Sequence, residues 1–382
     1  MVTMPGSNRW VPVGVLAALQ GAVTLCWVIY NFYLPDLLQQ VGVGAAVAIG
    51  IQLVENALAA VVEPLMGGAS DRLRQWVGSR FPLIAAGVVG AVALFALIPW
   101  LNQAVILCTV VVLWAVAMSV FRSPALAQIH RYVNDYAQPR AVALLTLVGG
   151  VVGGFAPVTQ SWLVQQGPAV AFTVGSLVLL LVGIILRWVD GPTVTPAEAP
   201  TRDPVSWPVL LPLLGLGFGV GVAFRMMLMR VPDLVAPSLP VPDPSWVVAA
   251  ILLISGAVAL PAGQVVQRLG TQGAVRLGLV GMAAGMALCA LFPPAGAVWV
   301  VLLGTGFSLV STGAISHALA LSSAPWAGLA VGLYFGGFSA AMAVINAVLA
   351  WTEMASVFLI PIGMAGSLLG FLSVRRSQPP AQ

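Results

Sequence analysis

Two glutamates stand inside one long apolar stretch, where little around them can stabilise a charge. Glu55 and Glu63 lie eight residues apart within residues 44–66. Eight residues are a little over two turns of an α-helix, so the two carboxylates share a face. If this stretch enters a membrane at Gly44, Glu55 lies ~16 Å along it, near the midplane, and Glu63 lies two turns deeper. Burial disfavours the charged form of a carboxylate, so such a group can take up and release a proton.

Buried carboxylates of this kind suit the binding and release of a cation. Two carboxylates on one face could hold a sodium ion, but no further acids are evident in the apolar stretches around 11–34 and 104–124, which favours a proton. Glu55 could instead be a structural acid that is hydrogen-bonded to a neighbouring helix. Glu63 stands nearer the membrane surface, where a carboxylate costs less, and a gating role is open to it.

Two arginines also lie within apolar stretches. Arg122 reaches a depth similar to that of Glu63, and we expect the two side chains to form a pair that breaks and reforms as a cavity opens. Arg225 lies in the outer part of residues 208–230. The first interpretation of Arg225 is a structural ion pair with Asp36, and the second is contact with an anionic substrate.

The composition indicates that lipid is the solvent for most of this chain. Its 382 residues are 60% hydrophobic and only 7% charged, whereas soluble domains carry roughly 25% charged residues. The 15 arginines and 11 acids leave a net charge of +4, a surplus that indicates topology and not nucleic-acid binding. The three cysteines lie in apolar runs and offer no disulfide framework or metal-ligand spacing.

Twelve apolar runs are long enough to cross a membrane, which takes about 20 residues each. With the N-terminus inside, thirteen of the fifteen arginines fall on the cytoplasmic side, which is a strong positive-inside bias. The first run is too long for a signal peptide, so we expect no cleaved leader. The predicted spans are 11–34, 44–66, 81–100, 104–124, 141–163, 168–188, 208–230, 245–267, 274–293, 297–320, 325–350 and 354–374.

A polar, Pro-rich segment divides the chain into two halves. We predict a six-helix bundle over 1–188, a cytoplasmic linker over 189–207 and a second six-helix bundle over 208–382. A second Pro-rich connection is expected at 231–244. The 6+6 layout suggests the duplicated fold of a transporter, all-α, pseudo-symmetric and with both termini in the cytoplasm.

One segment carries a specific motif after the second predicted span. It reads Glu63-Pro-Leu-Met-Gly-Gly-Ala-Ser-Asp71-Arg72-Leu-Arg74-Gln-Trp-Val-Gly78-Ser-Arg80-Phe-Pro82. This segment resembles the loop between helices 2 and 3 of the major facilitator superfamily, most closely in the glycoside/cation symporter and sucrose-transporter-like branch. The Glu55-Asn56 pair and the Phe121-Arg122-Ser123-Pro124 segment are similar to that branch as well.

The resemblance implies roles for further residues. It implies that Asp71, Arg72 and Arg80, together with Arg122, form a gate that closes the cytoplasmic side. It also implies a central cavity lined chiefly by helices 1, 4, 7 and 10, whose aromatic, amide and hydroxyl groups suit a sugar-like ligand and also many drugs. The candidates for this cavity are Gln20, Trp27, Tyr30, Asn31, Asn56, Trp114, Arg225 and His317.

The predicted function is secondary active transport of a small solute by alternating access, with protons coupled through the helix 2 carboxylates. The alternative is a carrier-like membrane protein that does not transport and acts as an assembly or binding partner. The sequence contains no nucleotide-binding loop, metal cluster or nucleophile–base arrangement, so we expect no enzyme activity, no cofactor and no bound metal. We expect a multi-pass monomer in a bacterial inner membrane that binds no nucleic acid.

Overall fold

The computed structural model describes residues 8–191, 206–322, 324–351 and 356–377, and its regular secondary structure over these ranges is helical. Residues 192–205, which make up most of the predicted linker, lie outside the described ranges. The α-helices are α1 (Trp10–Gln40), α2 (Ala45–Val77), α3 (Phe81–Leu97), α4 (Ala104–Ala127), α5 (Ile129–Tyr132), α6 (Gln138–Gly154), α7 (Ala156–Asp190), α8 (Trp207–Val235), α9 (Ser245–Ala257), α10 (Ala259–Leu291), α11 (Gly296–Leu321), α12 (Ala327–Trp351) and α13 (Leu359–Arg376). Short 3₁₀ turns are η1 (Ile98–Trp100), η2 (Ala236–Ser238), η3 (Pro293–Ala295), η4 (Ala324–Trp326) and η5 (Ser356–Phe358).

The described helices account for twelve membrane spans, although two of the spans are broken. Ten helices are long and apolar enough to cross a membrane. The predicted spans 141–163 and 245–267 are each interrupted, at Phe155 between α6 and α7 and at Val258 between α9 and α10. A proline follows each break within three residues, and its missing N–H group removes a hydrogen bond to the preceding turn.

Two glycines turn the chain between consecutive spans without a loop. Gly167 within α7 and Gly270 within α10 have φ of 75° and ψ of 164° and 162°. This region of backbone conformation is essentially restricted to glycine. Each long helix therefore holds the second part of a broken span and the next complete span, which meet at a sharp bend.

The gate motif lies on a helix and not in a loop, which corrects the sequence prediction. Helix α2 continues past residue 66 to Val77, so Asp71 and Arg72 occupy its last turns. Gly78 then ends the helix in a left-handed conformation, and its N–H group donates to Arg74 O at 2.9 Å. Helix α8 likewise runs through Pro232 to Val235, into the segment predicted to be a Pro-rich connection.

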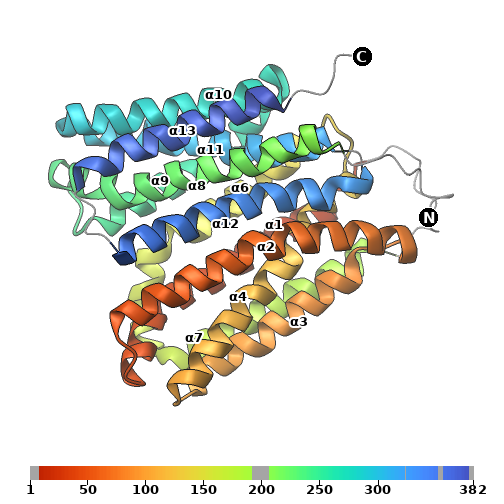
Figure 1. The fold of residues 1–382 in the computed structure, drawn as a ribbon, viewed down its shortest axis with the longest axis horizontal. Helices are drawn as coiled ribbons and strands as arrows, with labels where there is room; N and C mark the ends of the chain where they lie inside the picture. The colour runs from red at the N-terminus through yellow and green to blue at the C-terminus, as the bar shows by residue number, and fades with distance from the viewer. Residues whose placement is uncertain (1–7, 192–205, 323, 352–355, 378–382) are drawn as a thin grey trace.

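The helices form two bundles that lie side by side (Figure 1). Helices α1–α7 form the N-terminal half and α8–α13 form the C-terminal half. The bundle end at which α1 begins and α13 ends is called the terminal end here, and the other is the opposite end. The halves meet where α2 packs on α12 and where α6 packs on α9 and α10.

The α2–α12 contact is close at the terminal end. A Cβ atom on Gly67 would lie 2.1 Å from Gly328 O, and one on Gly332 would lie 2.5 Å from Glu63 O. Glycine at these positions lets the two backbones touch, as in many membrane helix pairs. On the other side of the molecule, Gly150 of α6 faces Gly256 of α9 in the same way.

Candidate functional site

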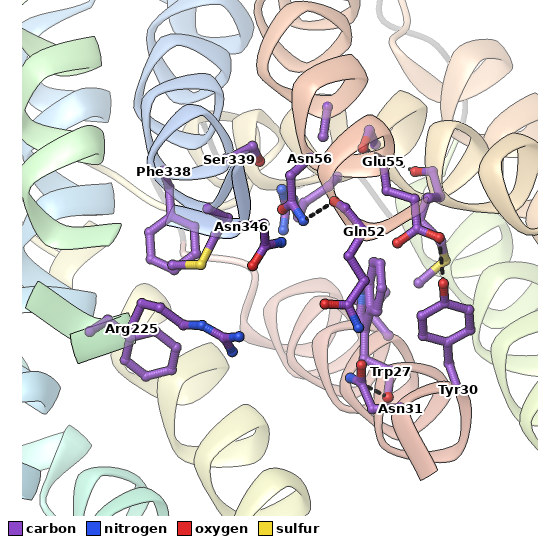
Figure 2. A pocket seen from close by; sticks show the side chains of 18 residues that line it. Trp27, Tyr30, Asn31, Gln52, Glu55, Asn56, Arg225, Phe338, Ser339 and Asn346 are labelled. Atoms are coloured by element: carbon purple, nitrogen blue, oxygen red, sulfur yellow. Dashed lines mark hydrogen bonds between the residues drawn. The ribbon is translucent and has the colours of Figure 1, made fainter. Parts of the chain in front are cut away.

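A polar cavity lies between the two halves. Its larger lobe has a volume of about 480 Å³ and its smaller lobe about 300 Å³, and Arg122, Phe224 and Phe338 line both. Figure 2 shows the larger lobe, with side chains from both halves pointing into it. The larger lobe is lined by Val23, Trp27, Tyr30, Asn31, Gln52, Glu55, Asn56, Ala59, Ala115, Met118, Ser119, Arg122, Phe224, Arg225, Phe338, Ser339, Met342 and Asn346.

Glu55 stands on the α2 wall of the larger lobe. It is 5% exposed, and the Tyr30 hydroxyl of α1 donates a hydrogen bond to Glu55 Oε1. Gln52 and Asn56 precede and follow it on α2 and line the same lobe, where Asn56 donates to Gln52 O at 2.7 Å. Glu55 thus has one phenolic partner and a direct position on the cavity wall.

An aromatic stack fixes the position of Tyr30. Its ring centroid lies 4.6 Å from that of Trp114, which in turn lies 4.8 Å from Trp27 and 5.0 Å from Phe95. Trp114 is fully buried and lies behind the lining residues, and not among them. This predicted cavity residue therefore supports Tyr30 and Trp27 from behind.

Glu63 is sealed below the cavity and is paired with Arg122. It is 0% exposed, and Arg122 Nε and Nη2 lie 2.6 and 2.5 Å from Glu63 Oε1. Ser123 donates to Glu63 Oε2. The Arg122 guanidinium also lies 4.4 Å from the ring centroid of Phe335 on α12, so it contacts the C-terminal half. The expected Glu63–Arg122 pair is present, and it forms the base of the cavity.

Arg225 extends into the larger lobe from α8, opposite Glu55 (Figure 2). Its Nε atom is buried and has no hydrogen-bond partner among the described residues. Asp36 is exposed at the end of α1, and no ion pair joins it to Arg225 within the described ranges. The predicted ion pair with Asp36 is therefore wrong: Asp36 is exposed and lines neither lobe, whereas Arg225 lines the larger lobe.

A cluster at the terminal end joins the two halves, and we call it the terminal gate: Asp71, Arg80, Gly328 and Leu329. The carboxylate of Asp71 accepts hydrogen bonds from Gly328 N at 3.0 Å and Leu329 N at 2.8 Å, at the start of α12. Arg80 Nη2 lies 2.7 Å from Asp71 Oδ1. A carboxylate at a helix N-terminus interacts favourably with free N–H groups and with the helix dipole.

Two further hydrogen bonds cross between the halves at this end. His130 of the α4–α6 region contacts Leu319 O at 3.1 Å, and Gln267 of α10 donates to Tyr136 O at 2.6 Å. Arg72 is exposed and has no polar partner among the described residues, so it lies outside the terminal gate.

The remaining predicted cavity residues divide into two groups. Asn31 lines the larger lobe, where it donates to Trp27 O at 2.8 Å, and Gln20 lines the smaller lobe. His317 lies away from both lobes, between Thr271 at 3.0 Å and Ser377 at 2.7 Å, near the terminal end.

Sequence reasoning missed several lining residues. The signal for Gln52 was available, because it stands one helical turn from Glu55 and Asn56 on the same face. Residues of α12 were missed because that helix was not expected to line the cavity. The missed lining residues include Gln52, Phe224, Phe338, Ser339, Met342 and Asn346.

The cavity is closed at the terminal end by contacts between the two halves. The α2–α12 seam holds from Asp71 and Gly328 as far as Ala60 and Gly336. Beyond these positions the facing residues line the larger lobe, which extends toward the opposite end. Two helical halves around a cavity, with one end sealed by contacts between the halves, are the architecture of a membrane carrier.

Residues 16–346 match the Major Facilitator Superfamily, and the chain belongs to this family of secondary transporters, which are not enzymes. The chain is similar in fold to the human organic anion transporter MFSD10 (TETRAN), with a TM-score of 0.74 and 15% identity over 96% of this chain and 98% of that chain. It is also similar to the transporter FucP in the outward conformation, with a TM-score of 0.71 and 12% identity over 97% and 99% of the two chains. A comparison with curated protein sequences gave no match.

Proposed function

We propose that this transporter is a symporter in which protons are coupled to a small, sugar-like solute through Glu55. The observation that carries the proposal is the position of Glu55: a buried carboxylate, hydrogen-bonded to Tyr30, on the wall of the substrate cavity. A group so placed is within reach of both solute and proton. Glu63 is bound by Arg122 and Ser123 and is sealed from the lobe, which supports a gating role for it.

The one-sided closure supports alternating access. Bonds from Asp71 to the start of α12 hold the terminal end shut, and they must break before the cavity can open at that end. The arginine distribution supports a cytoplasmic terminal end, with both termini inside. On this assignment the structure is outward-facing, in a multi-pass monomer of a bacterial inner membrane.

The lining of the larger lobe supports a hydroxylated solute. Asn31, Gln52, Asn56 and Asn346 supply amide donors and acceptors, and Trp27 offers an aromatic face. Amides pair with hydroxyl groups, and aromatic faces pack on the C–H faces of sugars.

The test is solute uptake into proteoliposomes under an imposed pH gradient. We expect accumulation with wild-type protein and its loss with Glu55→Gln, because an amide cannot carry the proton across. Counterflow exchange without a gradient should persist in that variant. Asp36→Asn is the matched control, since Asp36 is an exposed carboxylate outside the cavity, and its accumulation should equal that of wild type.

Accumulation that ignores the pH gradient, or that survives Glu55→Gln unchanged, would contradict the coupling role. A protein that moves no tested solute and purifies with a stoichiometric partner would favour the alternative, a carrier-like binding or assembly factor.

A further inference from the structure

The guanidinium of Arg225 is the part of the cavity that the proton-coupling scheme does not use. It projects from α8 into the larger lobe toward Asn346 and Gln52 (Figure 2). Its Nε atom is buried without a hydrogen-bond partner in the described part of the chain. A cation is thus presented to the solute from the wall opposite Glu55.

A charge in this position is costly unless something binds it. An arginine side chain stays protonated in proteins, and placing a charged side chain in the membrane interior is unfavourable. Two other arginines between the helices have carboxylate partners within 2.7 Å: Arg80 has Asp71, and Arg122 has Glu63. Arg225 has no such partner in the described ranges, so an anion from outside the chain would neutralise its charge.

The charges that line the larger lobe can be counted. They are Glu55 on α2, Arg122 on α4 and Arg225 on α8. Glu63 neutralises Arg122, and Tyr30 is the hydroxyl group that faces Glu55 from α1. Once Glu55 is protonated, a step that rests on the proposed function, the lobe carries a single uncompensated positive charge. One monoanion balances it.

The groups beside Arg225 suit the rest of such a molecule. Asn346 and Ser339 on α12 line the same lobe and offer hydrogen bonds to hydroxyl groups. Phe338 and Trp27 offer apolar faces. A guanidinium binds a planar carboxylate with two parallel N–H···O hydrogen bonds, which fixes both position and orientation.

We propose that the transported solute is a small organic monoanion whose carboxylate binds Arg225, with a hydroxylated body held by the amide and aromatic side chains of the larger lobe. The chemical class is a sugar acid or a hydroxylated carboxylic acid. Its neutral counterpart lacks the group that pairs with Arg225, and it is therefore a poor ligand.

The test is ligand-induced thermal stabilisation of the purified full-length protein in detergent, with matched pairs of probes. The carboxylates are glucuronate, gluconate and benzoate, and their neutral counterparts are glucose, sorbitol and benzamide. We expect stabilisation by at least one of the carboxylates, with its neutral counterpart binding at least tenfold more weakly. Because Arg225→Gln removes a charged hydrogen-bond partner, it should weaken carboxylate binding by roughly 10- to 100-fold.

Two variants make the result specific. Arg225→Lys keeps the charge but loses the two-pronged geometry, so it should retain part of the carboxylate affinity. Arg230→Gln is the matched control, because Arg230 lies on the same helix and lines neither lobe, and its affinity should equal that of wild type.

Stabilisation by the neutral probes alone, equal binding of both members of each pair, or stabilisation by none of the three carboxylates would each overturn the proposal. The wild-type comparison decides between these outcomes even if Arg225→Gln fails to fold. The assay measures binding without a gradient or transport. A failure of the anion site is therefore distinguishable from a failure of proton-coupled uptake, which the proteoliposome assay measures separately.

Discussion

At the scale of single residues, the base of the cavity depends on one buried carboxylate with two partners. Glu63 is fully buried and accepts hydrogen bonds from Arg122 and Ser123, whereas the Arg122 side chain is 24% exposed toward the cavity. Removing the arginine therefore leaves a buried charge, but removing the carboxylate leaves a cation that can still reach water. Replacing Arg122 should therefore destabilise the protein more than replacing Glu63.

This asymmetry gives a stability prediction. Arg122→Gln should lower the free energy of unfolding by about 3 kcal/mol, the cost of leaving a buried ion without its partner. The double variant Glu63→Gln/Arg122→Gln should recover most of that loss. Denaturant unfolding in detergent measures both. Arg140→Gln, at an exposed arginine of α6, is the control and should change stability by less than about 0.5 kcal/mol.

A double variant as unstable as Arg122→Gln would show that the arginine stabilises the fold by some means other than neutralising Glu63. Its packing on Phe335 would then be the first contact to vary.

The sequence predicted the positions of some of these residues correctly, and it failed for others for physical reasons. Helical periodicity puts Glu55 and Glu63 on one face of α2, and the structure has both facing the interior. Periodicity within one helix says nothing about which neighbour lies opposite, so the Asp36 pairing of Arg225 was wrong. The lining role of Asn346 depends on how α12 is rotated against α2, which is a tertiary property.

At the scale of helices, the terminal gate is a contact between the last turns of α2 and the first turn of α12. Asp71 accepts from Gly328 N and Leu329 N, and it is neutralised by Arg80 from its own half. The N-terminus of α12 is thus held by a carboxylate of the other bundle. Weakening this carboxylate should favour opening of the terminal end.

Asp71→Asn tests this expectation, because an amide binds the two N–H groups more weakly and leaves Arg80 without its partner. We expect a longer distance distribution between spin labels at Trp76→Cys on α2 and Arg268→Cys on α10, two exposed positions at the terminal end. Arg72→Gln is the control, since Arg72 lies outside the terminal gate. Unchanged distances in Asp71→Asn, or equal lengthening in Arg72→Gln, would contradict the assignment.

The sequence predicted that these helices exist, but it did not predict all of their ends. Hydropathy located the spans, but it ended α2 near residue 66, because the charged residues that follow read as a loop. In the fold α2 continues to Val77 and carries Asp71, which binds α12 and pairs with Arg80 just before α3. Hydropathy also could not register the interruptions at Phe155 and Val258, which depend on backbone geometry.

At the scale of the whole molecule, the charges of the larger lobe determine what crosses the membrane in one cycle. If one proton on Glu55 accompanies one carboxylate on Arg225, the loaded carrier moves no net charge. Uptake of the carboxylate should then follow an imposed pH gradient and ignore a membrane potential set with potassium and valinomycin. A neutral solute with one proton would instead carry one positive charge per cycle, and an inside-negative potential would accelerate its uptake.

The distance along the chain between the partners of the terminal gate has a consequence for how the protein is made. Asp71 binds the N–H groups of residues 257 and 258 positions later, so the first bundle is synthesised long before α12 exists. Arg80 is only nine residues away in the sequence, so we expect it to neutralise the Asp71 carboxylate before α12 is made. We therefore expect the same arginine to stabilise the Asp71 carboxylate during insertion as well as in the finished gate.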